Sequence, residues 1–431
     1  MNKQMILQAA KQYGTPSYLY DGEAIITAYQ RLRKLASPHI DIFFSMKANP
    51  LLGICQLLRR EGACCEVCSE AELSVALKAG FQPSQIIFVG PGKTEQECRL
   101  CVEHNIYAIV CESIEEVLLV DRLARTSGHP MSVLLRINPS FSIKNAPLKM
   151  GGTPTQFGID LEVVYSNQNT IQSCRSIRLL GIHIYNGSRL LDADAVIENT
   201  RHILQLANKL AAEWSLPFSC IDIGGGFGVP YFSDEHPLDV EKIFTALNPL
   251  FKVESQRHGS VRFILECGRY LVSEAGQMIG RVLSTKISHG ESFVINDAGM
   301  NCHLAATGIG SYMKRNFPIN VLKASENTSD EQQTYTITGP LCTPGDVIAR
   351  QVTLPSVAVG DYIIMNHAGA YGPTASPTGF LSHGYPAEIL FYKNQFHVLR
   401  PRQSKAAILE TQMGISLAAY PECNECIQDA N

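Results

Sequence analysis

The alternation of short apolar runs with helical patterns constrains the fold of this 431-residue chain more than any other feature. Runs rich in β-branched and aromatic residues predict eight strands, and helical periodicity follows most of them. Eight strand–helix units within about 240 residues are what a (β/α)8 TIM barrel requires, so the chain is predicted to be an α/β protein. The predicted strands are residues 40–45, 64–67, 85–89, 106–110, 131–137, 176–183, 219–223 and 261–266.

A doubly wound sheet is the alternative reading of the same alternation. Its glycine-rich fingerprint would follow the first strand, whereas the Gly-Gly-Gly run of this chain follows the seventh, which favours the barrel. The barrel is assigned to residues 31–276. Beyond residue 276 the pattern becomes strands separated by Gly, Pro and Asp turns, which predicts an all-β domain over residues 277–431.

Composition excludes several classes of protein. A net charge of −4 gives no reason to expect nucleic acid or an anionic membrane as a partner. Neither a signal peptide nor an apolar run long enough to cross a membrane is evident, so we expect a cytoplasmic protein.

Fourteen cysteines are present, and three pairs have the C-x-x-C spacing that often marks zinc. Cys65 lies in a predicted strand, and Cys98 and Cys101 have the spacing of a helix face turned to the core. We therefore expect buried thiols and no metal site. The third pair, Cys423 and Cys426, lies in a polar tail.

Lys47 lies where the first predicted strand ends, at the edge of a barrel where ligands bind. One interpretation is a solvated surface charge. The other is a partly desolvated amine with a lowered pKa, able to form a Schiff base with a carbonyl cofactor.

Other strand ends carry groups suited to a dianion. Gly224, Gly225 and Gly226 follow the seventh strand, where backbone N–H groups approach a phosphate without an intervening side chain. Alone they would indicate a flexible turn, but Ser188 and Arg269 lie at neighbouring strand ends. Together these residues predict a phosphate pocket.

Glu266 ends the eighth predicted strand, where a buried carboxylate needs a cationic partner. A salt bridge to Arg269 is one interpretation, and a protonated heterocyclic nitrogen is the other. A lysine, a phosphate pocket and a buried carboxylate together describe pyridoxal 5′-phosphate (PLP) bound as an imine.

The chain resembles the fold-type III PLP-dependent decarboxylases, the ornithine and diaminopimelate decarboxylase family. Six blocks carry the resemblance in the family's order: FSMKAN at 44–49, DIGGGFG at 222–228, ECGR at 266–269, NDAGM at 296–300, GPLC at 339–342 and AGAYG at 368–372.

The resemblance implies roles for individual residues. Lys47, Glu266 and Cys342 would be catalytic, as the Schiff-base lysine, the partner of the pyridine nitrogen and the acid that reprotonates the product carbon. The implied cofactor-binding residues are Lys47, Glu66, Tyr185, Ser188, Gly224, Gly225, Gly226, Glu266, Gly268, Arg269 and Tyr371. The implied substrate-facing residues are Cys342, Thr343, Asp346 and Tyr371.

The resemblance also implies a homodimer with shared active sites, in which Cys342 reaches the cofactor of the partner subunit. It places an N-terminal segment, residues 1–30, with the β-domain, which would account for the β-rich run at residues 17–21.

Two departures from the family pattern bear on the substrate. Family members have a histidine three residues before the serine of the sixth-strand motif, where this chain has Tyr185, and His183 lies two residues earlier. The arginine and tyrosine with which diaminopimelate decarboxylases grip the far end of the substrate are not reproduced at residues 302–307, and Thr343 follows Cys342 where they carry a glutamate. Diaminopimelate is therefore disfavoured, because an unmatched buried charge costs several kcal/mol.

The segments 151–158, 228–232 and 342–344 are most similar to a biosynthetic subgroup that decarboxylates amino acids on an acyl carrier protein. The glutamyl-carrier-protein decarboxylase of butirosin biosynthesis is an example. The expected reaction is decarboxylation of an L- or D-amino acid at its α-carbon, with Lys314 and Arg315 as candidates for meeting an acidic carrier or, equally, for an ordinary solvated turn.

Three alternatives remain open from the sequence. The first is a decarboxylase of a free amino acid of the diaminopimelate, ornithine or lysine type. The second is a PLP amino-acid racemase, although Glu266 and Cys342 disfavour it. The third is a relative without cofactor that regulates a partner.

Overall fold

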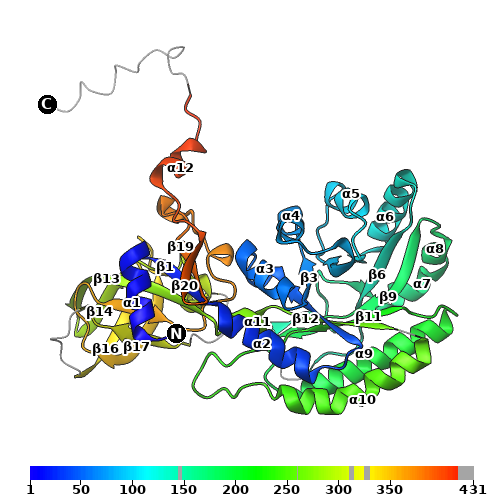
Figure 1. Ribbon diagram of the computed structural model, residues 1–431, viewed down its shortest axis with the longest axis horizontal. Coiled ribbons are helices and arrows are strands. Elements are labelled where there is room, and N and C mark those ends of the chain that lie inside the picture. Colours follow the sequence, from blue (N-terminus) through cyan, green and yellow to red (C-terminus); the bar gives the residue numbers. More distant parts are fainter. Residues whose placement is uncertain (144–147, 260, 310–314, 325–330, 416–431) are drawn as a thin grey trace.

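The computed structural model describes residues 1–143, 148–259, 261–309, 315–324 and 331–415. It contains a parallel barrel on one side and an all-β region on the other, with the C-terminal segment that carries α12 projecting away from both (Figure 1). Cys423 and Cys426, together with Lys314, lie outside the described residues.

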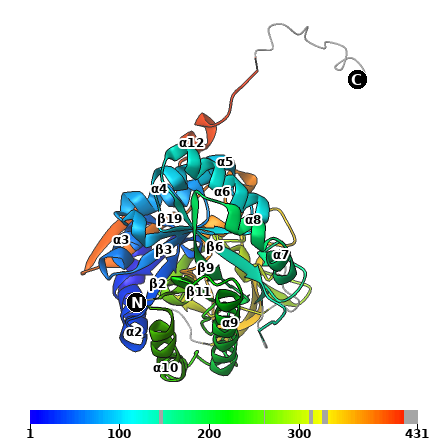
Figure 2. The same ribbon diagram turned by 90° about the vertical axis from the view of Figure 1, so that its right-hand side faces the viewer.

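Eight parallel strands close the barrel, in the order β5-β4-β3-β2-β12-β11-β9-β6, and the β5–β6 pairing completes the ring. The predicted barrel is confirmed. Viewed along the barrel, helices surround the strands (Figure 2). The strands are β2 Ile40–Ser45, β3 Cys64–Val67, β4 Ile86–Phe88, β5 Ala108–Cys111, β6 Met131–Asn138, β9 Ile177–His183, β11 Cys220–Gly225 and β12 Arg262–Cys267.

Several barrel helices begin where the sequence supplies a side-chain cap. The Thr94 hydroxyl accepts a hydrogen bond from the backbone N–H of Glu97, and the Glu97 carboxylate accepts one from the backbone N–H of Thr94. The two bonds form a capping box. Ser69 and Ser113 cap α4 and α6 in the same way without the return bond. The helices are α2 Gly22–Leu35, α3 Leu52–Arg60, α4 Glu70–Ala79, α5 Glu95–Glu103, α6 Ile114–Ser127, α7 Leu161–Ser166, α8 Gln168–Ser173, α9 Ala193–Glu213, α10 Val240–His258 and α11 Arg269–Val272.

Short strands lie beside the barrel mouth. β8 Ile159–Asp160 pairs in parallel with the end of β6, and β7 Leu148–Lys149 pairs with β10 Gly187–Ser188. The ribbon formed by β7 and β10 places Ser188 at the rim of the barrel.

The second sheet consists of nine strands from both ends of the chain. β1 Ser17–Asp21 pairs with β13 and β19, which is the placement that the family resemblance implied for this segment. Helix α1 Lys3–Tyr13 contacts β1, whereas α2 contacts the barrel helices α3, α10 and α11. The other strands are β13 Gly276–Ser288, β14 Glu291–Asn296, β15 Ile319–Leu322, β16 Gln332–Thr338, β17 Val347–Pro355, β18 Tyr362–Met365, β19 Ala387–Tyr392 and β20 Gln395–Arg400, and α12 spans Lys405–Glu410.

Strand β13 begins at Gly276, the residue after which the sequence pattern changes to an all-β one. Gly276 and Gly280 are strand residues packed against other parts of the chain. A Cβ at Gly276 would lie 2.2 Å from the Cα of Gly369, and one at Gly280 would lie 2.2 Å from Oδ1 of Asn296. These glycines therefore permit close packing and do not end a strand.

The prediction of buried thiols is confirmed for nine of the twelve described cysteines, whereas Cys68 and Cys174 are partly exposed and Cys342 is exposed. All twelve described cysteines are free thiols, and Cys98 and Cys101 are fully buried on α5. No helix in the described part of the chain has both the length and the apolar character needed to cross a membrane.

Candidate active site

A cavity of about 540 Å³ opens at the carboxyl ends of the barrel strands. Residues from six barrel strands or the loops that follow them line it, and one residue comes from the second sheet region. The lining residues are Lys47, Cys68, Val89, Gly90, Pro91, Gly92, Lys93, Arg136, Leu148, Met150, Phe157, His183, Tyr185, Ser188, Glu266, Arg269 and Tyr371.

Lys47 lies in a one-turn 3-10 helix, Met46–Ala48, that follows β2. Its side chain is 36% exposed and lines the cavity. Its Nζ lies 2.6 Å from Oε1 of Glu66, a fully buried residue of β3. Burial by itself lowers the pKa of Lys47, but the surrounding groups, Glu66 foremost and then Cys68 and Glu266, together outweigh burial and raise the pKa well above its ordinary value. The lowered pKa predicted from the sequence is therefore wrong for the chain without cofactor.

Glu266 at the end of β12 is 2% exposed, and its partner is a histidine. Oε1 of Glu266 lies 3.2 Å from Nε2 of His183, the last residue of β9. Arg269 does not pair with Glu266, so the salt bridge considered from the sequence is not present. The carboxylate lines the cavity that contains Lys47.

The three glycines leave no room for side chains. A Cβ at Gly225 would lie 1.7 Å from the carbonyl oxygen of Glu266, and Gly226 combines a φ of +79° with a backbone oxygen 2.0 Å from its Cβ position. Gly224 also has a positive φ. The three glycines are needed because the backbone of this segment packs closely against neighbouring backbone, and the run is not a flexible turn.

Arg269 is held by aromatic residues. Its NH1 donates to the Tyr231 hydroxyl at 2.8 Å, and its guanidinium lies 4.6 Å from the ring centroid of Tyr371. Nε of Arg269 is buried without a hydrogen-bond partner, and no carboxylate pairs with this guanidinium among the described residues. Arg269 therefore retains positive charge that can face an anion.

Tyr371 enters the cavity from the loop after β18. Its φ is +54°, a conformation that costs a non-glycine residue about 1–3 kcal/mol. Its backbone N–H donates to the carbonyl of Ala48, beside Lys47, at 2.8 Å. This bond ties the second sheet region to the loop of Lys47.

Tyr185 and Gly268 lie on either side of the Lys47 loop. The ring centroid of Tyr185 is 5.6 Å from Nζ of Lys47. Burial raises the pKa of Tyr185 to about 12, so its hydroxyl stays protonated near neutral pH. Gly268 is required for packing, since its Cβ would lie 2.9 Å from Cβ of Ala48.

Of the four residues predicted to face the substrate, Tyr371 lines this cavity, whereas Cys342, Thr343 and Asp346 of the same chain do not. Cys342 is exposed and does not line it. Asp346 is 2% exposed, and its two carboxylate oxygens accept the N–H groups of Met300 at 2.6 Å and Leu341 at 2.8 Å. Asp346 therefore shapes the loop that holds Cys342 and Thr343.

Sequence reasoning did not assign three charged or polar residues of the cavity. His183 was considered only as a departure from the family pattern. Arg136 is bound to Glu112 at 2.7 Å, and Lys93 to Glu116 at 3.0 Å. His183 ends a predicted strand, Arg136 is the last residue but one of another, and Lys93 lies in the segment after a third, so these positions at strand ends were the available signal.

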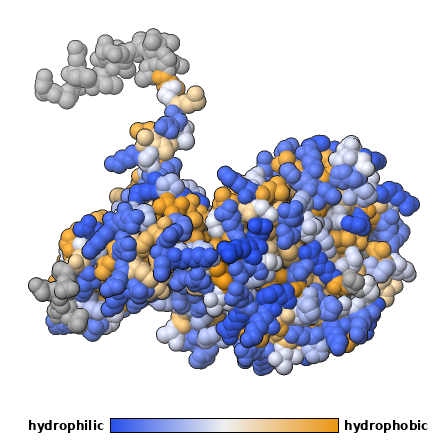
Figure 3. Space-filling view, viewed as in Figure 1, coloured by the Kyte–Doolittle hydropathy of each residue, from blue (hydrophilic) through white to orange (hydrophobic). Residues whose placement is uncertain are grey.

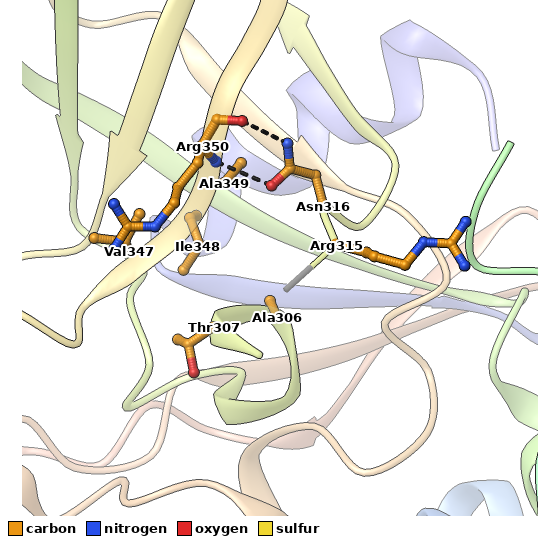
Figure 4. Close-up of a pocket in the computed structure, with 8 residues that line it drawn as sticks. All are labelled: Ala306, Thr307, Arg315, Asn316, Val347, Ile348, Ala349 and Arg350. Carbon is orange, nitrogen blue, oxygen red and sulfur yellow. Dashed lines mark hydrogen bonds between the residues drawn. The ribbon is translucent and has the colours of Figure 1, made fainter. Parts of the chain in front are cut away.

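A second cavity, of about 250 Å³, lies in the second sheet region between β17 and the segment around Arg315 (Figure 4). The Asn316 amide exchanges two hydrogen bonds with the backbone of Arg350, and the Arg315 guanidinium points away from Arg350. Arg315 forms ion pairs with Asp234 and Glu235. Its charge is thus largely compensated within the chain.

The residues of the first cavity fit PLP. Arg269, which has no carboxylate partner among the described residues, and Ser188 both line this cavity and would offer donors to phosphate oxygens. The same cavity is lined by the amine of Lys47 and the buried carboxylate of Glu266.

Comparisons with known proteins agree with this geometry. Residues 23–273 match the family model of the pyridoxal-dependent decarboxylase, pyridoxal binding domain. The L-glutamyl-[BtrI acyl-carrier protein] decarboxylase of Niallia circulans is 37% identical over 95% of this chain and 96% of its own length.

Diaminopimelate decarboxylases are more distant relatives. That of Methanothermobacter thermautotrophicus is 28% identical over 94% of this chain and 93% of its own. The crystal structure of diaminopimelate decarboxylase from M. jannaschii in co-complex with L-lysine has a TM-score of 0.85 at 27% identity, covering 95% of this chain and 94% of that one. The chain therefore belongs to the pyridoxal-dependent decarboxylases and is a PLP-dependent amino-acid decarboxylase.

Proposed function

We propose that this enzyme removes the α-carboxyl group of an amino acid held as a thioester on an acyl carrier protein, with a glutamyl-type group as the leading candidate. The observation that carries the proposal is that nearly every charged side chain lining the cavity already has a partner in the described chain. A substrate with a second charged end would find no free countercharge there.

The pairing is systematic. Lys47 is bound to Glu66, Lys93 to Glu116 and Arg136 to Glu112. Glu266 is bound to His183. Arg269 remains without a carboxylate partner, and the cofactor phosphate accounts for its charge.

Apolar side chains also line the cavity. They belong to Val89, Pro91, Leu148, Met150 and Phe157. Free diaminopimelate, ornithine or lysine would place an ammonium group against these side chains at a cost of several kcal/mol. A thioester has no such charge. The carrier-protein substrate of the 37% identical relative supports the same choice.

Individual residues would have separate roles in binding the cofactor and in catalysis. Ser188, Arg269 and Tyr371 hold the phosphate, and Glu266 keeps the pyridine nitrogen protonated because an adjacent carboxylate favours the cation. Lys47 holds the cofactor, and Glu66 is placed to accept the proton that Lys47 must lose first. The bound cofactor supplies the electron sink for the carbanion left by loss of CO2.

A homodimer completes the proposal. Cys342 is exposed here, and in a head-to-tail dimer it would protonate the product carbon in the site of the partner subunit. Exposed apolar side chains support an interface: Leu381 is 50% exposed, and Leu409 and Met413, on the projecting C-terminal segment, are 65% and 97% exposed. Figure 3 shows hydrophobic residues gathered near the base of that segment, on an otherwise largely hydrophilic face.

The free thiols support a cytoplasmic location as part of this proposal. Nine of the twelve described cysteines are buried and none is paired. Unpaired cysteines in this number suit a reducing compartment.

The test compares CO2 release from a panel of aminoacyl-carrier proteins with release from the same free amino acids. We expect carrier-bound glutamate to exceed the free amino acids in kcat/KM by at least about 100-fold, which is about 2.7 kcal/mol. Lys47→Ala is the control that abolishes both. Efficient turnover of free diaminopimelate or lysine would overturn the substrate assignment.

A further inference from the structure

Three titratable side chains from neighbouring strands meet at one end of the cavity. His183 on β9, Asp222 on β11 and Glu266 on β12 each offer a ligand atom within 4.8 Å of the others. His183 and Asp222 are fully buried, and Glu266 is 2% exposed. Asp222 lies beside His183 in the parallel β9–β11 register, so the barrel itself builds the cluster.

The hydrogen bond between His183 and Glu266 has a defined direction. A carboxylate only accepts, so Nε2 of His183 donates to Oε1 of Glu266 across 3.2 Å. Nδ1 of His183 has no partner among the described residues, which favours the tautomer with its proton on Nε2. The bond fixes one oxygen of Glu266 and leaves the other for a further partner.

Asp222 has surroundings that differ from those of Glu266. Its Oδ1 accepts the N–H of Gly224 at 2.9 Å, and its Oδ2 has no hydrogen-bond partner in the described chain. Burial, followed by the charge of Glu266, raises the pKa of Asp222 well above its ordinary value. Asp222 is therefore the member of the carboxyl pair whose surroundings favour the protonated form.

Glu266 takes the opposite state. Burial alone would raise its pKa, but His183, Lys47 and Arg136 together outweigh burial and lower it. Two carboxyl groups this close do not both ionise cheaply, and the surroundings select Glu266. The cluster carries one negative charge on a carboxylate held by the imidazole.

We propose that His183 and Asp222 are positioning residues that fix the orientation and the single negative charge of Glu266, so that its free oxygen binds the ring N–H of the cofactor. The inference rests on the proposed placement of the cofactor ring nitrogen at Glu266. It gives His183 a role separate from that of Tyr185, which lies beside Lys47.

The experiment measures the ring nitrogen directly. Enzyme reconstituted with PLP labelled with 15N in the ring is compared with His183→Leu, His183→Gln and Asp222→Asn by 15N NMR. We expect the wild-type resonance at the protonated position and a shift in His183→Leu toward neutral pyridine. His183→Gln, whose amide can still donate, should restore much of the wild-type value. Asparagine resembles a neutral aspartic acid in shape, so Asp222→Asn should retain it.

Separate measurement of kcat and KM gives a second readout. His183→Leu should lower kcat by about tenfold or more and leave KM within about twofold, as loss of a group that orients a catalytic residue does. Three outcomes would overturn the inference: an unchanged 15N resonance in His183→Leu, loss of the protonated resonance in Asp222→Asn, or a stoichiometric metal ion in the purified enzyme.

Two controls keep the result interpretable. The melting temperature and cofactor content of each variant are measured first, and Asp222→Asn decides the charge assignment even if His183→Leu does not fold. Absence of Lys47-dependent PLP binding in the wild type would instead overturn the proposed function.

Discussion

The Lys47 amine lies 2.6 Å from the Glu66 carboxylate at the adjacent ends of β2 and β3. The pair keeps Lys47 cationic in the chain without cofactor. A cationic amine cannot attack an aldehyde, so the proton must leave before the cofactor is bound.

Replacing Glu66 by Gln should therefore move cofactor capture to lower pH. Lys47 is protonated below its raised pKa, and removal of the neighbouring charge leaves burial, which lowers the pKa. Each unit of lowering increases the neutral amine about tenfold. The measurement is the rate at which apoenzyme binds PLP between pH 6 and 9, followed by absorbance. Glu61→Gln, which alters a carboxylate bonded to Gln30 outside the cavity, is the control and should match the wild type. An identical pH profile in Glu66→Gln would show that Glu66 does not set the charge of Lys47.

Mixing two inactive variants tests whether active sites are shared. In the proposed dimer, Lys47→Ala disables the cofactor side of a site and Cys342→Ala disables the side given by the partner. Half of the randomly mixed dimers then contain one intact site of two, so about a quarter of wild-type activity should return. Mixing at equal concentrations after mild dissociation provides the assay. If activity stays at the level of the separate variants, Cys342 acts in its own subunit or not at all.

Asp346→Asn should destabilise the loop that carries Cys342. The substituted amide would place a donor against the N–H of Met300 or Leu341, with a cost of about 1–3 kcal/mol. Urea unfolding at fixed protein concentration, together with the reactivity of the Cys342 thiol, gives the readout. The matched control is Asp234→Asn, an exposed carboxylate paired with Arg315, for which we expect less than about 1 kcal/mol. A changed KM with unchanged stability would support the substrate role predicted from the sequence instead.

His303 should make the protein less stable in mild acid. It is 1% exposed, and Nδ1 lies 2.9 Å from the Tyr18 hydroxyl. Burial, with a contribution from Arg269, lowers the pKa of His303 to about 4, whereas the unfolded chain binds this proton near pH 6.5. Stability from this group is complete above about pH 6.5 and is lost as the pH falls toward 4, by up to about 3 kcal/mol. In His303→Gln, the unfolding free energy measured across this range should be flatter by that amount. The same slope in both proteins would rule out His303 as its source.

Much of the site could be predicted from local sequence because a barrel gathers strand ends. Lys47, Ser188, Glu266 and Arg269 each follow or end a strand that the apolar pattern marks, and parallel closure brings those ends to one cavity. Gly225 could be recognised for the same reason, since a backbone approach of this kind excludes any side chain.

The hydrogen-bond partners of these charged side chains could not be predicted in this way. Arg269 is three residues from Glu266 in the sequence, yet Glu266 binds His183, which lies 83 residues away. Arg269 binds Tyr231 instead. The register of three strands decides these contacts, and no local pattern encodes register between strands this far apart.

The sequence by itself determined the barrel, the second sheet and the chemical types at the strand ends, because periodicity and glycine placement are local consequences of backbone geometry. Only the tertiary structure decided the raised pKa values of Lys47 and Asp222 and the pairing of His183 with Glu266. These depend on burial and on charges brought within a few ångströms by strands distant in the chain, where the cost of desolvation makes each neighbour decisive.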